Sequence, residues 1–375
     1  MAGPLDRSVS RAPSAPRVEF TVARPEDDPV LRALLRDNPM GKNPALSLER
    51  EPRYADGDGL WPGSRTVLAR EFPPARRPVG LYQCQLGPVH LNGRPVDAGY
   101  LGGLRVEPAF RRRLSVLKAG YDSIRALVPW DRERVWFTSL AADNRAARRL
   151  LERGLDGLPR YRPVGELETF VFDSRLGRSK GLWRPAVRGE VRELAAFVNR
   201  QNAEFHFSPV LSAEDLLADR AGLSWRLFHV FEEGGEIRAA LAPWDQRAYK
   251  QAVVRGYAGG LKTFRPLLNA IHRIMRLPPW PAVGEPWEGG FLAFFAVHPG
   301  ERRRLGPLIR EGLYHLRRRG CGVGYWGLSP ENPLRKFARR LPHLSYRTVI
   351  ETVRWPDSDL PGLDERPVQP EAALL

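Results

Sequence analysis

Cysteine is nearly absent from the sequence, and its scarcity argues against two common stabilising devices. Of 375 residues, only Cys84 and Cys321 are cysteine, and neither lies in a CxxC pair or in a cluster with histidines. The sequence therefore gives no indication of a disulfide framework or of a zinc site. We expect no metal cofactor and a reducing, cytoplasmic location.

Long apolar runs are also missing. No stretch approaches the length that a membrane-spanning helix needs, and residues 1–16 lack the apolar core of a signal peptide. We therefore expect no membrane partner. Hydrophobic residues still make up 42% of the chain, which excludes wholesale disorder and predicts folded domains.

Lysine is scarce, whereas arginine is abundant. Only six of the 59 basic residues are lysine, and the formal net charge is +16. This charge favours acidic partners such as phosphorylated cofactors or nucleic acid. A GC-rich genome explains the arginine bias equally well, so the charge alone does not identify a partner.

One motif occurs twice. VEPAFRRRL at 106–114 returns as VHPGERRRL at 297–305. Three pairs of positions keep similar separations: Arg111 and Arg302 by 191 residues, Asn144 and Asn332 by 188, and Glu168 and Glu351 by 183. Similar order at slightly shrinking separations predicts an internal duplication.

Apolar periodicity predicts the same closing elements in each half of the chain. The first half has predicted strands at 17–23, 65–71, 78–86, 98–106, 134–140 and 166–172, and helices at 26–36, at 144–153 and from Leu114, with an apolar stripe at Leu114, Leu117, Tyr121, Ile124 and Val128. The second half has predicted strands at 290–297, 323–328 and 346–355, and helices from Leu305, at 332–340 and before Pro278.

The polar segment at 174–184 is the predicted linker between the halves. It separates an N-terminal domain at 17–173 from a C-terminal domain at 185–356. Residues 1–16 and 357–375 lack apolar periodicity, and we expect both to be loose tails.

The order strand, arginine-rich turn, amphipathic helix, strand and Asp-Asn helix start resembles the GNAT N-acetyltransferase superfamily. The resemblance implies an α/β (α+β) fold with two tandem GNAT-like modules, each a mixed, mainly antiparallel sheet flanked by helices. It also implies an acyl-CoA-dependent N-acyltransferase that uses acetyl-CoA as co-substrate. The acceptor is then an amine on a small molecule, a peptide or a protein.

In that family, the turn after the fourth strand presents backbone N–H groups to the cofactor pyrophosphate at a helix N-terminus. The resemblance places this donor site at Leu104, Arg105, Val106, Arg111, Arg112, Arg113, Leu114, Ser115 and Val116. The family's small residues are missing from the turn, so we expect the three arginines to compensate by pairing with phosphates. The alternative is a solvated basic turn. The second turn, 302–307, also contains Pro307, which lacks an amide donor.

Asn144 and Ala147 fit the family's Asn-x-x-Ala helix start, where the asparagine lies beside the pantetheine arm. Asn144 is equally compatible with a plain N-cap. The tyrosine that commonly acts as general acid seven residues later is replaced by Leu151. The proton donor to the departing thiolate is then another group, for example Tyr161, or solvent.

A general base for an amine is expected to be a carboxylate. The loop at 48–58 supplies Glu49, Glu51, Asp56 and Asp58 where the family places acceptor-binding segments. We take Glu49 and Glu51 as the candidate catalytic carboxylates. A solvated charged loop is the alternative.

Three hypotheses follow. The first is an acyl-CoA-dependent N-acyltransferase in which the first module works, because its turn has no proline. The second is an aminoacyl-tRNA-dependent transferase of the same fold, for which the basic charge is suitable. The third is a non-catalytic module that binds CoA, nucleotide or RNA, consistent with the missing tyrosine and glycines.

Overall fold

The computed structural model describes residues 17–41, 43–60, 63–72, 76–111, 113–220, 222–358 and 361–375. The predicted tail at 1–16 and the predicted donor-site residue Arg112 lie outside these ranges. No helix in the described part of the chain is long and apolar enough to cross a membrane.

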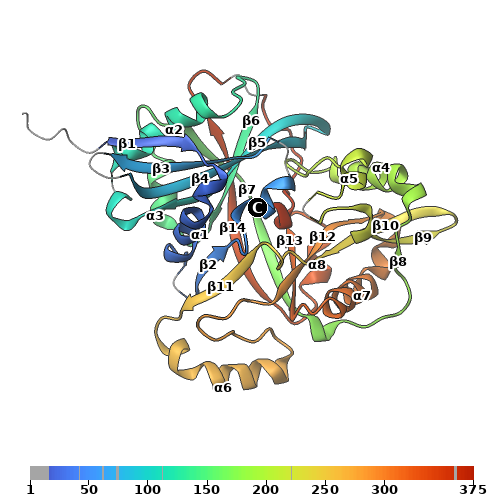
Figure 1. Ribbon diagram of the computed structural model, residues 1–375. Coiled ribbons are helices and arrows are strands. Elements are labelled where there is room, and N and C mark those ends of the chain that lie inside the picture. The colour runs from blue at the N-terminus through green and yellow to red at the C-terminus, as the bar shows by residue number, and fades with distance from the viewer. Residues whose placement is uncertain are drawn as a thin grey trace, which may run out of the picture.

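One large sheet forms the centre of the molecule (Figure 1). Its strands, in order across the sheet, are β1 (Arg17–Val22), β3 (Arg65–Phe72), β4 (Arg77–Leu91), β5 (Arg94–Val106), β6 (Val135–Ala141), β14 (Leu344–Arg354), β7 (Arg160–Asp173), β13 (Val323–Leu328), β12 (Gly289–Val297), β10 (Glu236–Trp244), β9 (His229–Glu233) and β8 (Arg184–Pro185). Neighbours are antiparallel except for β5 with β6 and β12 with β13. The expected mixed, mainly antiparallel sheet with flanking helices is confirmed.

The two halves of the chain exchange strands at the centre of this sheet. The last strand of the second half, β14, lies between β6 and β7, and the last strand of the first half, β7, lies between β14 and β13. Each half therefore completes its sheet with a strand from the other half. The sequence indicated two modules but not this joining of their sheets.

Helices cover both faces of the sheet. Their bounds are α1 (Asp28–Asp37), α2 (Leu114–Leu127), α3 (Arg145–Leu151), α4 (Val191–Asn202), α5 (Ala213–Ala218), α6 (Gly260–Met275), α7 (Leu305–Arg318) and α8 (Arg335–Ala338). In the first half, α2 and α3 pack together against Cys84 and Trp136, whereas α1 packs against Leu68 and Leu81 on the other face. A separate two-stranded sheet pairs β2 (Ala45–Glu49) with β11 (Gln251–Gly256).

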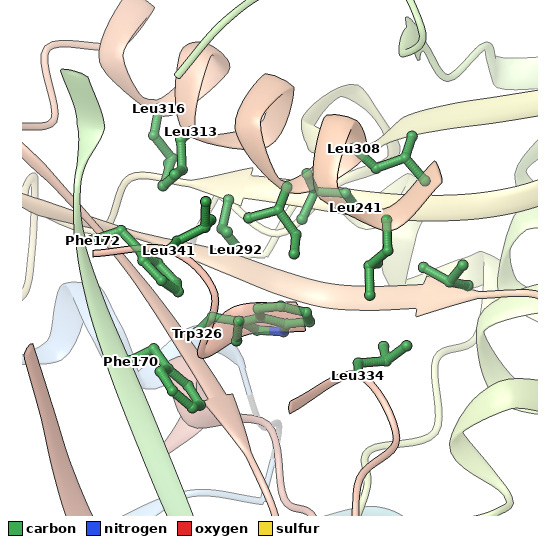
Figure 2. Close-up of a cluster of buried hydrophobic side chains, with 14 of the residues drawn as sticks. Phe170, Phe172, Leu241, Leu292, Leu308, Leu313, Leu316, Trp326, Leu334 and Leu341 are labelled. Carbon is green, nitrogen blue, oxygen red and sulfur yellow. The ribbon is translucent and has the colours of Figure 1, made fainter. Parts of the chain in front are cut away.

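The apolar stripes of α2 and α7 differ at their first residue. The apolar residues of α7 on the side facing the sheet, Leu305, Leu308, Ile309, Leu313 and Leu316, are all buried. Figure 2 shows Leu308, Leu313 and Leu316 pointing from this helix toward Leu241 and Leu292 of the sheet. In α2, Leu114 is 39% exposed, so this residue does not belong to the buried stripe.

The expected loose tail at 357–375 is wrong for its last part. Val368 and Ala373 are buried, and the side-chain oxygen of Gln369 accepts hydrogen bonds from Ser329 N (3.1 Å) and Asn332 Nδ2 (2.6 Å). Single apolar residues and side-chain hydrogen bonds hold this segment to the sheet. Neither produces a periodic pattern in the sequence.

Candidate functional site

The parallel strands β5 and β6 separate within the first half. Their pairing ends at Leu101 and Thr138, whereas β5 continues to Val106 and β6 to Ala141. The Thr138 hydroxyl donates a hydrogen bond to the Leu101 carbonyl (2.6 Å) at the last backbone pair, and the next residue of β6, Ser139, still contacts the Tyr100 hydroxyl (2.7 Å). Beyond it, the two strand ends diverge.

A β-bulge lies on β5 directly after this point. Gln83 of β4 pairs with Gly102 and Leu81 pairs with Arg105, so Gly103 and Leu104 together oppose one residue of β4. Gly103 has a φ of +65°, which favours glycine. The bulge leaves Leu104, a predicted donor-site residue, half exposed.

The turn that follows leads to an exposed helix start. A 3-10 turn at Pro108–Phe110 precedes α2, and the side chain of Arg113, the N-cap residue, makes no capping hydrogen bond. Leu114 and Ser115 are exposed and Val116 is partly buried. An uncapped, accessible helix start favours an anion through its amides and its dipole.

Two of the arginines in this turn have local partners. Arg111 donates to the Val106 carbonyl (2.9 Å) and to Asn38 Oδ1 (3.1 Å). Arg113 lies over the Phe110 ring at 4.3 Å, and its Nη1 is 3.8 Å from Glu71. Both side chains are thus fixed beside the helix start.

A polar network from the loop after β2 faces the bulge. Asp58 accepts hydrogen bonds from Gln83 Nε2 (2.6 Å) and from Arg50, and Arg50 Nη2 donates to Gln83 Oε1 (2.9 Å). The Arg50 guanidinium also lies over the Tyr54 ring at 4.6 Å. Burial raises the pKa of Asp58 above its ordinary value, despite the opposing effect of Arg50. Because Gln83 is directly opposite Gly102, this network brings Asp58 to the bulge.

Glu49 and Glu51, the carboxylates selected from the sequence, form ion pairs with arginines of α1 and β11. Glu49 is buried and contacts Arg255 Nε at 3.0 Å, across the sheet of β2 and β11. Glu51 accepts a hydrogen bond from Arg36 (2.9 Å) and another from Arg32, both on α1. The structure therefore gives both carboxylates contacts that hold the loop in place.

Arg105 follows the bulge and has no carboxylate partner among the described residues. It is 7% exposed, its Nη1 donates to the adjacent Leu104 carbonyl (2.8 Å), and its Nε is buried without a partner. Burial and the nearby Arg111 lower its pKa. An unpaired buried cation is costly, so this position suits an anionic group of a ligand.

Two acidic groups, Tyr161 and Glu351, lie on the face of the sheet opposite Asp58, which is the face that α3 covers. Tyr161 shares a hydrogen bond with Tyr121, and burial raises its pKa well above the ordinary value. Glu351 of β14 is directly beside Thr138 of β6, and its side chain is fully buried. Burial, with the nearby Glu152, raises the pKa of Glu351 to about 7.

Tyr161 is farther from the strand divergence than Glu351, because β14 separates β7 from β6. The sequence contained one signal for Glu351, namely an acidic residue in the apolar strand 346–355. Asp58 was one of four acidic residues in its loop. Only the tertiary packing against Gln83 distinguishes it.

Asn144 begins α3, and its Oδ1 accepts a hydrogen bond from the Ala147 amide (3.3 Å). The N-cap interpretation therefore explains the Asn-x-x-Ala spacing, and a role beside pantetheine stays a prediction. His298 likewise acts locally, since its Nδ1 accepts from the Gly300 amide (3.2 Å).

The equivalent region of the second half is closed. Pairing of β12 with β13 ends at Phe291 and Tyr325, and a bulge follows at Phe294, which has a φ of +50°. The Phe294 amide donates to the Glu371 carboxylate (2.8 Å). Beyond the last pair, the rings of Phe295 and Trp326 contact each other with centroids 4.9 Å apart.

Within the described residues, no group of three or more His, Cys, Asp or Glu side chains is arranged to hold a metal ion. No family model and no curated protein matches the sequence.

Solved structures are similar to the whole chain. One is Saccharomyces cerevisiae N-myristoyltransferase with bound myristoyl-CoA, with a TM-score of 0.59 and 10% identity over 93% of this chain and 85% of that chain. A GCN5-related N-acetyltransferase from Sphaerobacter thermophilus has a TM-score of 0.54 and 15% identity, over 94% and 98%. The glucosamine N-acetyltransferase region of a fungal β-N-acetylglucosaminidase has a TM-score of 0.57 and 17% identity, over 92% and 38%. The chain therefore has the fold of the GCN5-related N-acetyltransferase superfamily.

Proposed function

We propose that the chain transfers an acyl group from a CoA thioester to an amine, where β5 and β6 diverge in the first half. The observation that carries this proposal is the combination of three features at one place. These are the bulge at Gly103, the exposed start of α2 and the carboxylate of Asp58 facing the bulge.

The start of α2 binds the phosphates of the donor. Leu114 and Ser115 provide exposed backbone, and Arg111 and Arg113 provide charge beside it. The pantetheine arm then follows the free end of β5 toward Leu104, with Asn144 on the other side. Acyl-CoA bound in this way supplies the activated carbonyl.

The acyl group is short, and acetyl-CoA is the proposed donor. Tyr100, Phe137 and Phe207 occupy the space beneath the last pair of β5 and β6, with the rings of Phe137 and Phe207 stacked 4.6 Å apart. The cavity that they line is only about 20 Å³. Although one structural neighbour binds myristoyl-CoA, this space does not accommodate a long chain.

Asp58 acts as the general base. It takes the proton that the amine loses as its nitrogen bonds to the thioester carbonyl carbon, and its raised pKa makes it a stronger base than an ordinary carboxylate. Gln83 and Arg50 hold its orientation. Glu351, with a pKa of about 7, lies beside Thr138, the last paired residue of β6, and gives a proton to the sulfur when the carbon–sulfur bond breaks.

Calorimetry with CoA, acetyl-CoA and myristoyl-CoA tests the donor, and thiol release from acetyl-CoA with a panel of amines tests transfer. We expect CoA and acetyl-CoA to bind and myristoyl-CoA not to gain affinity from its chain. Binding of tRNA without any binding of CoA species would replace this proposal with the aminoacyl-tRNA hypothesis. CoA binding without thiol release for any amine would favour the non-catalytic hypothesis.

A further inference from the structure

Helix α6 projects from the molecule beside the small sheet of β2 and β11 (Figure 1). None of its 16 residues is buried. One side of the helix is fastened to the segment that follows it. Asn269 exchanges hydrogen bonds with Trp280 (2.8 and 3.0 Å), and His272 contacts the Pro278 carbonyl (2.6 Å). The helix is therefore held against this segment, and none of its residues belongs to the described hydrophobic clusters.

The apolar side of α6 faces solvent. Its exposed apolar residues lie at spacings of three and four along one helix face: Phe264 (58% exposed), Leu267 (60%), Ile271 (41%), Ile274 (82%) and Met275 (56%). Large apolar side chains of this kind are normally buried, and a contiguous exposed group marks an interaction surface. No described residue of the chain covers this face.

The remaining surface of α6 is basic. Lys262, Arg265, Arg273 and Arg276 lie on or next to the helix, and no Asp or Glu occurs between residues 257 and 284. None of the four cations forms an ion pair within the described chain. An amphipathic helix with unpaired basic residues complements an anionic lipid surface, where the apolar side enters the headgroup boundary.

The charge of the protein also indicates which kind of partner the apolar face of α6 binds. A second copy carries the same net charge of +16, so repulsion between two copies would oppose contact through this face. An anionic membrane instead attracts all four cations and the net charge of +16.

We propose that α6 is a peripheral docking helix that binds anionic lipid surfaces through its apolar face. Docking of this kind needs no spanning segment, so it revises our expectation of no membrane partner without requiring a long apolar run. The proposal does not depend on the transfer reaction.

Co-sedimentation of the full chain with vesicles tests the proposal. The wild type is expected to bind vesicles of phosphatidylcholine with phosphatidylserine more tightly than vesicles of phosphatidylcholine alone, and high salt is expected to weaken binding. The double variant Leu267→Glu/Ile274→Glu should lose about tenfold or more in affinity, because it places charge in the docked face. The matched control Val187→Glu/Leu217→Glu changes two exposed residues elsewhere, 54% and 44% exposed, and should bind as the wild type does.

Circular dichroism and thermal melting verify that both variants are folded, as expected for exposed positions. Equal sedimentation of the α6 variant and the wild type would overturn the proposal. A second outcome would also overturn it: the wild type does not bind the vesicles but forms a dimer, as measured by light scattering, and the α6 variant does not form this dimer.

Discussion

The two halves of the molecule contain the same strand divergence, but only the first leaves it open. Gly103 and Phe294 occupy equivalent bulges, separated by the same 191 residues as Arg111 and Arg302. At the first bulge no described side chain bonds to the Gly103 amide, whereas the second amide is held by Glu371. The shared backbone therefore does not decide where a ligand fits. The side chains that fill or leave the divergence decide it.

A second pair of residues shows the same contrast. Glu168 on β7 contacts Arg335 of α8 (2.8 Å) and Ser345 (3.0 Å), and these bonds keep its pKa low. Glu351 on β14 is 3.7 Å from Arg148 of α3, and both its oxygens lack a hydrogen-bond partner among the described residues. Through the strand exchange, β7 brings to the second-half sheet a carboxylate that is held by ion pairing, whereas β14 brings to the first-half sheet a carboxylate with a pKa of about 7.

The largest expected effect comes from substituting Asp58, the proposed general base. Asp58→Asn removes the carboxylate at the bulge but retains its shape, so acyl transfer should fall by about 10²–10⁴-fold, the usual contribution of a general base. Asp56→Asn in the same loop removes only an ion pair with Arg53 (3.0 Å) and should change transfer little. Steady-state thiol release measures both. Equal effects of the two substitutions would argue against a special role for Asp58.

The first residues of α2 and α7 should differ sharply in their effect on stability. Leu305 is fully buried, so Leu305→Ala should lower the free energy of unfolding by about 2–5 kcal/mol. Leu114→Ala should lower it by less than about 0.5 kcal/mol, because Leu114 is exposed. Urea denaturation separates the two values. A large loss for Leu114→Ala would mean that the start of α2 is covered.

The arginines of the two turns should differ in donor binding. Arg111→Ala/Arg113→Ala should weaken CoA binding by about 1.5–3 kcal/mol for each lost charge-assisted bond. Arg302→Ala/Arg303→Ala should leave the affinity unchanged, because the second turn leads to a closed divergence. Calorimetry with CoA compares the two variants, and a loss confined to the second would reverse the assignment.

Substitution of Asn144 should mainly reduce acyl transfer, whereas substitution of Asn332 should mainly reduce stability. Asn144→Ala should reduce transfer, with a loss of about 1 kcal/mol from the missing cap. Asn332 is buried and also donates to Gln369, so Asn332→Ala should cost about 1–3 kcal/mol of stability with little effect on transfer. Melting and thiol release are measured on the same samples. A greater loss of transfer from Asn332→Ala would point to the second half.

The last comparison concerns the dependence of stability on pH. The pKa of Glu351 rises from 4.5 unfolded to about 7 folded, so the folded state binds more protons in between. Its contribution to stability is present below about pH 4.5 and is lost as the pH rises through 7. Glu351→Gln should remove this loss. Glu168 has a lowered pKa, so its contribution to stability is lost as the pH falls. Glu168→Gln should therefore make the free energy of unfolding less dependent on pH at acidic pH.

Denaturation measured at several pH values across this range shows whether the free energy of unfolding rises or falls with pH in each variant. Identical pH profiles for Glu351→Gln and the wild type would mean that the Glu351 carboxyl has an ordinary pKa.

Local patterns in the sequence predicted most of the elements. Strand 323–328 matches β13, and the helix expected before Pro278 is α6, because periodicity and proline act over a few residues. The central strand exchange was not predictable in this way, since β7 and β14 each satisfy the same apolar pattern in any sheet.

The same limit applies to the site. The repeated RRRL motif located the turn, but the acidic loop offered several equivalent carboxylates. Tertiary partners distinguish them: arginines on α1 and β11 pair with Glu49 and Glu51, whereas Asp58 packs against Gln83. These partners are distant in sequence, so no local pattern contains the information.

The exchange of β7 and β14 makes the closed half indispensable to the open one. A chain cut within 174–184 would leave β6 without its neighbour β14, and Glu351 would be absent from the first fragment. A closed divergence in one half therefore does not make that half of the molecule dispensable. Mutations can accumulate around the closed divergence, but any deletion of that half also removes part of the proposed site.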